Sequence, residues 1–178
     1  MVSRSVHGDP ASLSQTGGAL RQLASRLRTT GRGAHTAFDD ALAEDAAGGR
    51  RDRVVVAARR QYDAVDAAAA AAAVERDRAG SAVQAHASDL SEAVAQARSV
   101  AARADAAGLR VVDGVVLPTW GVAGVADGST TQSREQVQSQ LQAELDQLGV
   151  LLARRRSALV SALADSRDLL AGHAARLR

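Results

Sequence analysis

The sequence has no cysteine, lysine, isoleucine or asparagine, and one each of phenylalanine, tryptophan, tyrosine and methionine in 178 residues. The lack of cysteine excludes disulfides, thiol catalysis and thiolate metal ligands, whatever compartment the protein reaches. The shortage of bulky side chains argues against a thick sheet-based core. Alanine, at 41 positions, instead suits long helices that approach one another closely. We therefore expect an all-α protein.

The chain also has little net charge. The 22 basic residues, all arginine, face 20 acidic ones, so the net charge is +2 and the isoelectric point of about 10.2 reflects the high pKa of arginine. The longest apolar run, 67–74, is too short for a membrane span. Residues 1–9 show no signal-peptide pattern, so we expect a protein that is cytoplasmic when made.

Three stretches carry helical periodicity. Asp9 and Pro10 supply a cap and a first helical position, which predicts a helix over about 10–47 that ends before a glycine pair. A second helix is expected over about 50–107 and a third over about 132–177. The second contains a change of phase near Gly80, where we expect a kink or a change of packing partner.

The stretch from 109 to 131 interrupts the helical pattern. Asp113-Gly114 between two valine pairs predicts a two-residue β-hairpin, and a glycine-rich loop with Trp120 follows it. A short two-stranded ribbon must dock on another surface, either its own helices or another chain. Trp120 has the same two interpretations, as a plug at the end of the bundle or as a contact for a partner.

Short connections between long helices predict an elongated antiparallel bundle or coiled coil, one helical domain over 1–178 with the hairpin inserted. An alanine-rich monomer can leave an apolar stripe exposed, so we expect a protein partner with a complementary helical stripe, or a dimer. The residues predicted to bind the partner are Leu90, Val94, Val111, Val116, Trp120, Leu148 and Leu152.

Motifs for chemistry are absent. The four histidines are far apart and lack metal-ligand spacing, and no nucleophile, phosphate-binding or dinucleotide motif occurs. Arg154-Arg155-Arg156 fans around its helix, and no aromatic residues accompany it for base stacking, so nucleic acid is not favoured. We expect a protein that is not an enzyme and that takes no cofactor, metal or small-molecule substrate.

The chain resembles the actinobacterial WXG-type helical proteins associated with type VII secretion. The resemblance covers about the first 105 residues: the Gly8-Asp9-Pro10 start, the leucines from Leu13 to Leu27, Ala37-Phe38, and the turn into a longer alanine-rich helix. The Trp-x-Gly turn that names the family is missing here, because 46–49 is Ala-Ala-Gly-Gly and Trp120-Gly121 lies elsewhere.

The resemblance implies a non-enzymatic substrate or targeting partner of type VII secretion, exported without a classical signal. Tyr62 and Asp66 match the family's export signal, a tyrosine followed four residues later by an acid, although Tyr62 also fits a packing seam. Other hypotheses are a self-assembling coiled-coil scaffold with no secretion role, and a peripheral membrane or nucleic-acid binder whose affinity falls steeply with salt.

Overall fold

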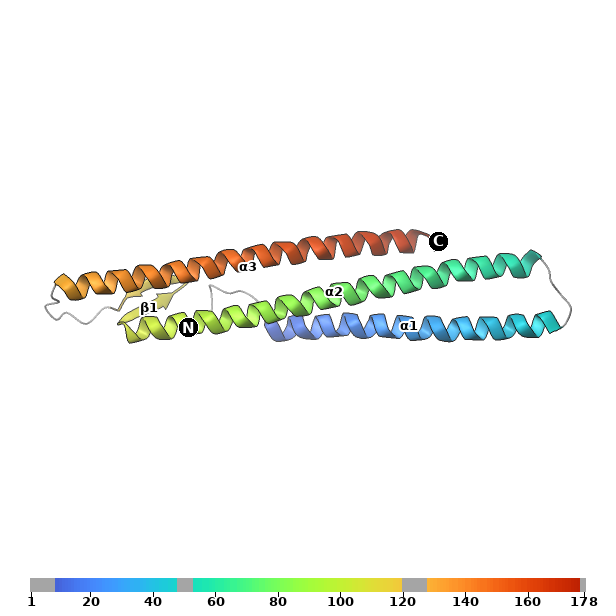
Figure 1. Cartoon of the computed structure of the whole chain (residues 1–178), viewed down its shortest axis with the longest axis horizontal. Helices are drawn as coiled ribbons and strands as arrows, with labels where there is room; N and C mark the ends of the chain where they lie inside the picture. The colour runs from blue at the N-terminus through green and yellow to red at the C-terminus, as the bar shows by residue number, and fades with distance from the viewer. Residues whose placement is uncertain (1–8, 48–52, 120–127, 177–178) are drawn as a thin grey trace. The chain divides into compact units, whose positions relative to one another are not determined.

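A computed structural model of the chain describes residues 9–47, 53–119 and 128–176 (Figure 1). The elements are three helices and two strands, in the order α1 Pro10–Ala47, α2 Arg53–Ala106, β1 Leu109–Val112, β2 Val115–Pro118 and α3 Gly128–Arg176. The expected fold class, all-α with a short β-hairpin, is confirmed. Trp120 and the rest of its loop to residue 127 lie outside the described residues.

The chain divides into two compact units. Of the described residues, the first unit contains 9–13, 85–119 and 128–158, and the second contains 14–47, 53–84 and 159–176. Helix α2 runs unbroken through Gly80 and contributes to both units.

Helix α1 begins where the sequence predicts. The Asp9 carboxylate accepts hydrogen bonds from the backbone N–H of Ala11 at 3.0 Å and of Ser12 at 3.3 Å. These are two of the amide groups that the first turn of a helix leaves without a partner. The Ser12 hydroxyl donates to the same carboxylate at 2.5 Å, and the three bonds lower the pKa of Asp9, with the hydroxyl as the largest cause.

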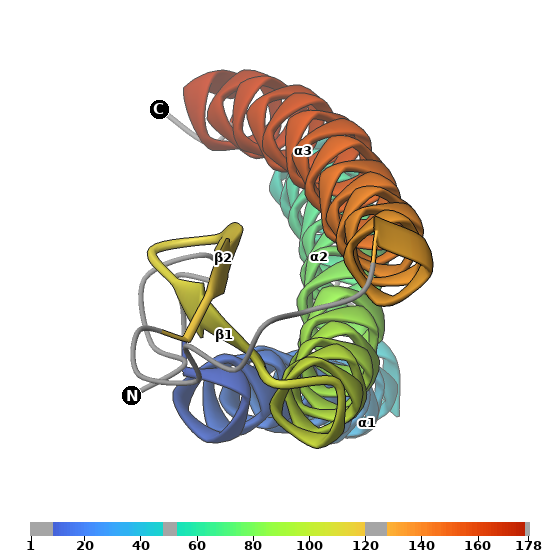
Figure 2. The ribbon, with the colours of Figure 1, turned by 90° about the vertical axis from the view of Figure 1, so that its left-hand side faces the viewer.

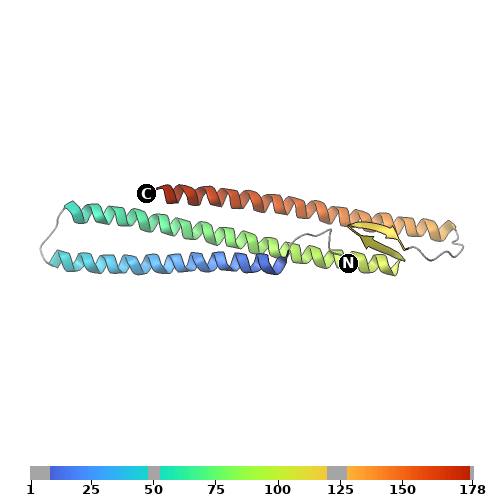
Figure 3. The same cartoon turned by 180° about the vertical axis from the view of Figure 1, so that it is seen from behind.

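In the second unit α1 and α2 lie side by side and antiparallel (Figure 3). The residues of α1 that face inward follow one line of three- and four-residue steps: Gly17, Leu20, Ala24, Leu27, Gly31, His35, Phe38 and Leu42. A strict seven-residue spacing from Leu20 and Leu27 would pass through Ala34 and Ala41, and both alanines are exposed. Seven residues are slightly less than two turns of a helix with 3.6 residues per turn, so positions seven apart rotate slowly around the helix. After Leu27 these positions no longer face α2.

Glycines bring the two helices together. A Cβ atom built on Gly17 would lie 2.6 Å from the carbonyl oxygen of Gly80, and one built on Gly80 would lie 2.7 Å from the carbonyl oxygen of Gly17. Only glycine permits this approach, because any side chain would meet the facing backbone. Gly80 therefore marks a close helix contact, and α2 continues unbroken through this position.

In the first unit, α2 ends at Ala106. Gly108 follows with a φ of +69°, and its N–H donates to the carbonyl oxygen of Asp105 at 3.1 Å. Strands β1 and β2 then pair antiparallel, with Val112 opposite Val115. Asp113 and Gly114 join them with φ values of 51° and 84°, the pair of positive angles that a type I′ turn needs. The predicted hairpin is confirmed.

Helices α2 and α3 of this unit enclose one apolar core with the inner face of the hairpin (Figures 1 and 2). Helix α3 begins at Gly128, four residues earlier than the sequence suggested. The buried residues of the core are Ala93, Ala97, Val100, Ala104, Leu109, Val116, Leu141, Leu145 and Leu148.

Candidate interaction site

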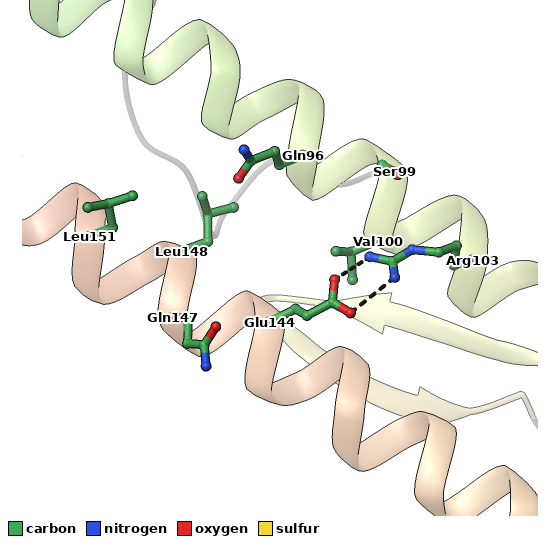
Figure 4. Close-up of a pocket in the computed structure, with 8 residues that line it drawn as sticks. All are labelled: Gln96, Ser99, Val100, Arg103, Glu144, Gln147, Leu148 and Leu151. Carbon is green, nitrogen blue, oxygen red and sulfur yellow. Dashed lines mark hydrogen bonds and ion pairs between the residues drawn. The ribbon is translucent and has the colours of Figure 1, made fainter.

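A groove runs between α2 and α3 in the first unit. Its main part has a volume of 320 Å³, and Leu148 and Val100 form its floor while the side chain of Leu151 stands at its rim (Figure 4). Leu151 is 44% exposed, whereas Leu148 is 8% exposed. The lining residues are Gln96, Ser99, Val100 and Arg103 from α2 and Glu144, Gln147, Leu148 and Leu151 from α3.

Two ion pairs cross the groove and hold the helices in register. The Arg103 guanidinium binds both carboxylate oxygens of Glu144, with one N–H donating to Oε1 at 3.0 Å (Figure 4). Arg155 donates to Oδ1 of Asp89 at 2.6 Å in a smaller adjoining pocket. Asp89 precedes Arg103 along α2 while Arg155 follows Glu144 along α3, so the helices are antiparallel here.

The Arg103–Glu144 ion pair shifts the pKa values of both residues. The bidentate hydrogen bond from Arg103 lowers the pKa of Glu144 below its ordinary 4.5 and raises the pKa of Arg103. The charges at the groove walls are thus paired with each other. Between them the groove presents valine, leucine, glutamine and serine side chains, a mixture of apolar and neutral polar groups that is common at protein–protein interfaces.

Glutamines of α3 dock the hairpin on the helices. Gln142 Oε1 accepts the backbone N–H of Val116 at 2.9 Å, and Gln138 Nε2 donates to the Val116 carbonyl oxygen at 2.8 Å. Gln142 Nε2 also donates to the carbonyl oxygen of Gly114 at 3.1 Å. The hairpin thus docks on its own chain, which is one of the two alternatives left by the sequence. The periodicity of apolar residues gave no signal for these polar contacts.

Most of the residues predicted to bind a partner are enclosed in the chain itself. Leu90, Val116 and Leu148 are 3%, 1% and 8% exposed, and Val94 is half-buried. Val111 and Leu152 pack partly buried against the core of the first unit. Trp120 lies outside the described residues. The groove brings Leu148 to its floor and Leu152 to the adjoining pocket, and it adds Leu151, which the sequence analysis did not select.

The suggested export signal lies in the second unit, on α2. The Tyr62 ring stacks on Phe38 of α1 with centroids 4.4 Å apart and planes 6° apart. Partial burial of the ring, followed by the charges of Asp66 and Asp39, raises the pKa of Tyr62. Tyr62 therefore packs in the helix seam, the second role that the sequence left open for it.

Two further kinds of feature are absent from the described ranges, a metal-ligand cluster and a membrane-spanning helix. Among these residues no three histidine, aspartate or glutamate side chains gather in a group able to hold a metal ion. None of the described helices has an apolar stretch long enough to cross a bilayer. Comparison with known protein families, with curated proteins and with solved structures gives no match to this chain.

Proposed function

We propose that the chain is a non-enzymatic protein–protein interaction module whose groove between α2 and α3 receives a helix of a partner protein. The observation that carries the proposal is the half-exposed Leu151 beside an apolar floor of Leu148 and Val100. An apolar stripe at helical spacing can pack into a groove between two antiparallel helices.

The ion pairs at the walls support a helix rather than a charged ligand. Arg103 and Arg155 are each bound to a carboxylate of the chain, so neither guanidinium is left to attract phosphate or nucleic acid. A partner that buries Leu151 gains hydrophobic free energy without having to separate these pairs. A second copy of the chain is one such partner.

Photocrosslinking tests the groove. A photoreactive amino acid is placed at Leu151 or, as a matched control, at Val150, which is 53% exposed on the same helix and does not line the groove. The proposal expects one defined adduct from position 151 in living cells and none from position 150. Equal adducts at both positions, or none at either, would contradict it.

For the biological setting, we propose type VII secretion, as a substrate or targeting partner, on the strength of the resemblance in the first 105 residues. Export is tested with tagged chain in an actinobacterial host with and without the secretion ATPase. ATPase-dependent appearance in the medium supports this role, and retention in both hosts contradicts export.

The export signal can be tested in the same hosts. Tyr62→Phe keeps the ring that stacks on Phe38, and Asp66→Asn keeps the size of its side chain. Loss of export in both variants, with unchanged melting temperatures, supports Tyr62 and Asp66 as a signal. If both variants are exported as well as the unaltered chain, Tyr62 and Asp66 are not an export signal and serve only in helix packing.

The second candidate is a self-assembling scaffold with no secretion role. Exposed aliphatic side chains, Leu151 among them, favour it. Sedimentation at increasing concentration separates the two candidates, because a scaffold forms open assemblies while a module that pairs with a partner stops at a fixed complex.

A further inference from the structure

The hairpin has two edges that differ. On β2, the outward-facing N–H and carbonyl oxygen of Val116 are bound by the side chains of Gln142 and Gln138. Val116 stands opposite Val111 of β1 in the register. In an antiparallel pair, residues opposite each other either both bond across the ladder or both point outward. Val111 therefore directs its own N–H and carbonyl oxygen away from β2.

The edge of β1 lacks the cover that the glutamines give to β2. Within the part of the chain that the structure describes, β1 pairs with β2 alone, and no described residue hydrogen-bonds to the outward groups of Val111. A strand edge in this condition is a template for another strand. The described residues thus cover the edge of β2 and leave the edge of β1 without a hydrogen-bond partner at Val111.

The face of the hairpin turned away from the core is apolar. Val112 and Val115, paired across the ribbon, are 40% and 47% exposed, and Leu117 beside them is half-buried. Arg110 stands opposite Leu117 on the same face, is exposed, and makes no ion pair with a described residue. An added strand would extend this face next to Val112 and Arg110.

We propose that β1 binds an extended peptide segment of a partner protein as a third, antiparallel strand. Val111 would exchange two backbone hydrogen bonds with it, an aliphatic residue would lie beside Val112, and an acidic residue would lie beside Arg110. This surface is separate from the groove between α2 and α3, and the proposal does not depend on a helix binding there.

Charge argues for a partner peptide over a second copy of the same strand. Two copies of β1 can pair antiparallel so that Leu109 of one copy stands opposite Val111 of the other. In that register Arg110 of one copy stands opposite Arg110 of the second copy. Like charges directly opposite each other destabilise a strand pair. An acidic residue at that position instead gains an ion pair.

Two capped pentapeptides test the proposal on the full chain: Thr-Val-Val-Glu-Thr and its lysine counterpart, Thr-Val-Val-Lys-Thr. A third probe carries an N-methyl group on the central valine and so lacks the donor to Val111. Binding is followed by NMR titration of the Val111 amide and by its hydrogen exchange. We expect the glutamate peptide to slow exchange at Val111 and to bind about threefold more tightly than the lysine peptide. N-methylation should weaken binding about tenfold.

Charge reversal supplies the matched control. Arg110→Glu should invert the preference between the two peptides, while Arg98→Glu, an exposed reversal on α2, should leave it unchanged. Equal affinity for all three peptides, or amide shifts confined to the groove residues, would overturn the proposal. Protection of Val111 that rises with protein concentration alone would overturn it in favour of a second copy.

Discussion

Gly17 and Gly80 meet with no room for a side chain on either, since a Cβ on one lies within 2.7 Å of the carbonyl oxygen of the other. The contact joins α1 to α2 inside the second unit. Nearby, Arg21 and Arg28 of α1 both pair with Asp77 of α2, at 3.2 and 3.6 Å. The glycines permit the short distance between the helices, and the two ion pairs link the helices beside this contact.

Alanine at Gly17 should destabilise the second unit. The added methyl group meets the Gly80 backbone, which cannot swing away as a side chain can, so we expect the free energy of unfolding to fall by about 1–2 kcal/mol despite the better helix propensity. Gly33→Ala is the control, because nothing lies within 4 Å of its added Cβ, and it should stabilise by roughly 0.5–1 kcal/mol. Denaturant titration measures both, and equal effects would refute the close contact.

Removal of the glutamine that docks the hairpin should loosen β2. Gln142→Ala leaves the Val116 N–H and the Gly114 carbonyl oxygen without their partner, at a cost of about 1–3 kcal/mol. Hydrogen exchange at the Val116 amide should accelerate accordingly. Gln140→Ala, on an exposed turn of the same helix, should change neither quantity. Unchanged exchange at Val116 in the first variant would contradict the docking described here.

The Arg103–Glu144 pair predicts a component of acid sensitivity. The pKa of Glu144 is lower in the folded chain than its ordinary 4.5, so its stabilising effect is complete above that value and is lost as the pH falls through the lowered pKa. Glu144→Gln should therefore narrow the stability difference between neutral and acidic solution. Thermal melts across this pH range measure the effect, and identical acid profiles for both proteins would argue against the pair.

Tyr62 offers a direct optical test, since it is the single tyrosine of the chain. Its phenol should ionise above the ordinary 10.0, because partial burial and the charges of Asp66 and Asp39 disfavour tyrosinate. The tyrosinate absorbance gives the midpoint. Asp66→Asn should move the midpoint down, and Asp168→Asn, an exposed substitution on α3 outside the causes of the shift, should not. A midpoint at or below 10.0 in the unaltered chain would be inconsistent with the stacked, half-buried ring.

Local signals in the sequence predicted the elements well. Asp9 and Pro10 specify a helix start through backbone amides within one turn, and Asp113-Gly114 specifies a turn by its positive φ angles. Each signal acts over a few neighbouring residues, so it survives in any tertiary context. The start of α3 was placed too late because several hydroxyl residues from 129 to 133 can each act as a cap.

Contacts between distant residues were not predictable from the same patterns. A glycine inside a helix normally lowers its stability, whereas the lack of a side chain at Gly17 is what admits Gly80. Gln142 looked like an ordinary exposed residue until the hairpin backbone came beside it. Leu151 lies next to Leu152, which was predicted to bind a partner, and periodicity alone does not tell which of two adjacent leucines packs inside.

The most direct test of the interaction module compares two neighbouring substitutions, Leu151→Arg and Val150→Arg. Both side chains are exposed, Leu151 at 44% and Val150 at 53%, but of the two residues only Leu151 lines the groove. Affinity is measured for the helical partner found by crosslinking, or for a second copy by sedimentation. We predict that Leu151→Arg weakens binding at least about tenfold with an unchanged melting temperature, while Val150→Arg retains it. Equal affinity of the two variants would contradict a partner site in the groove.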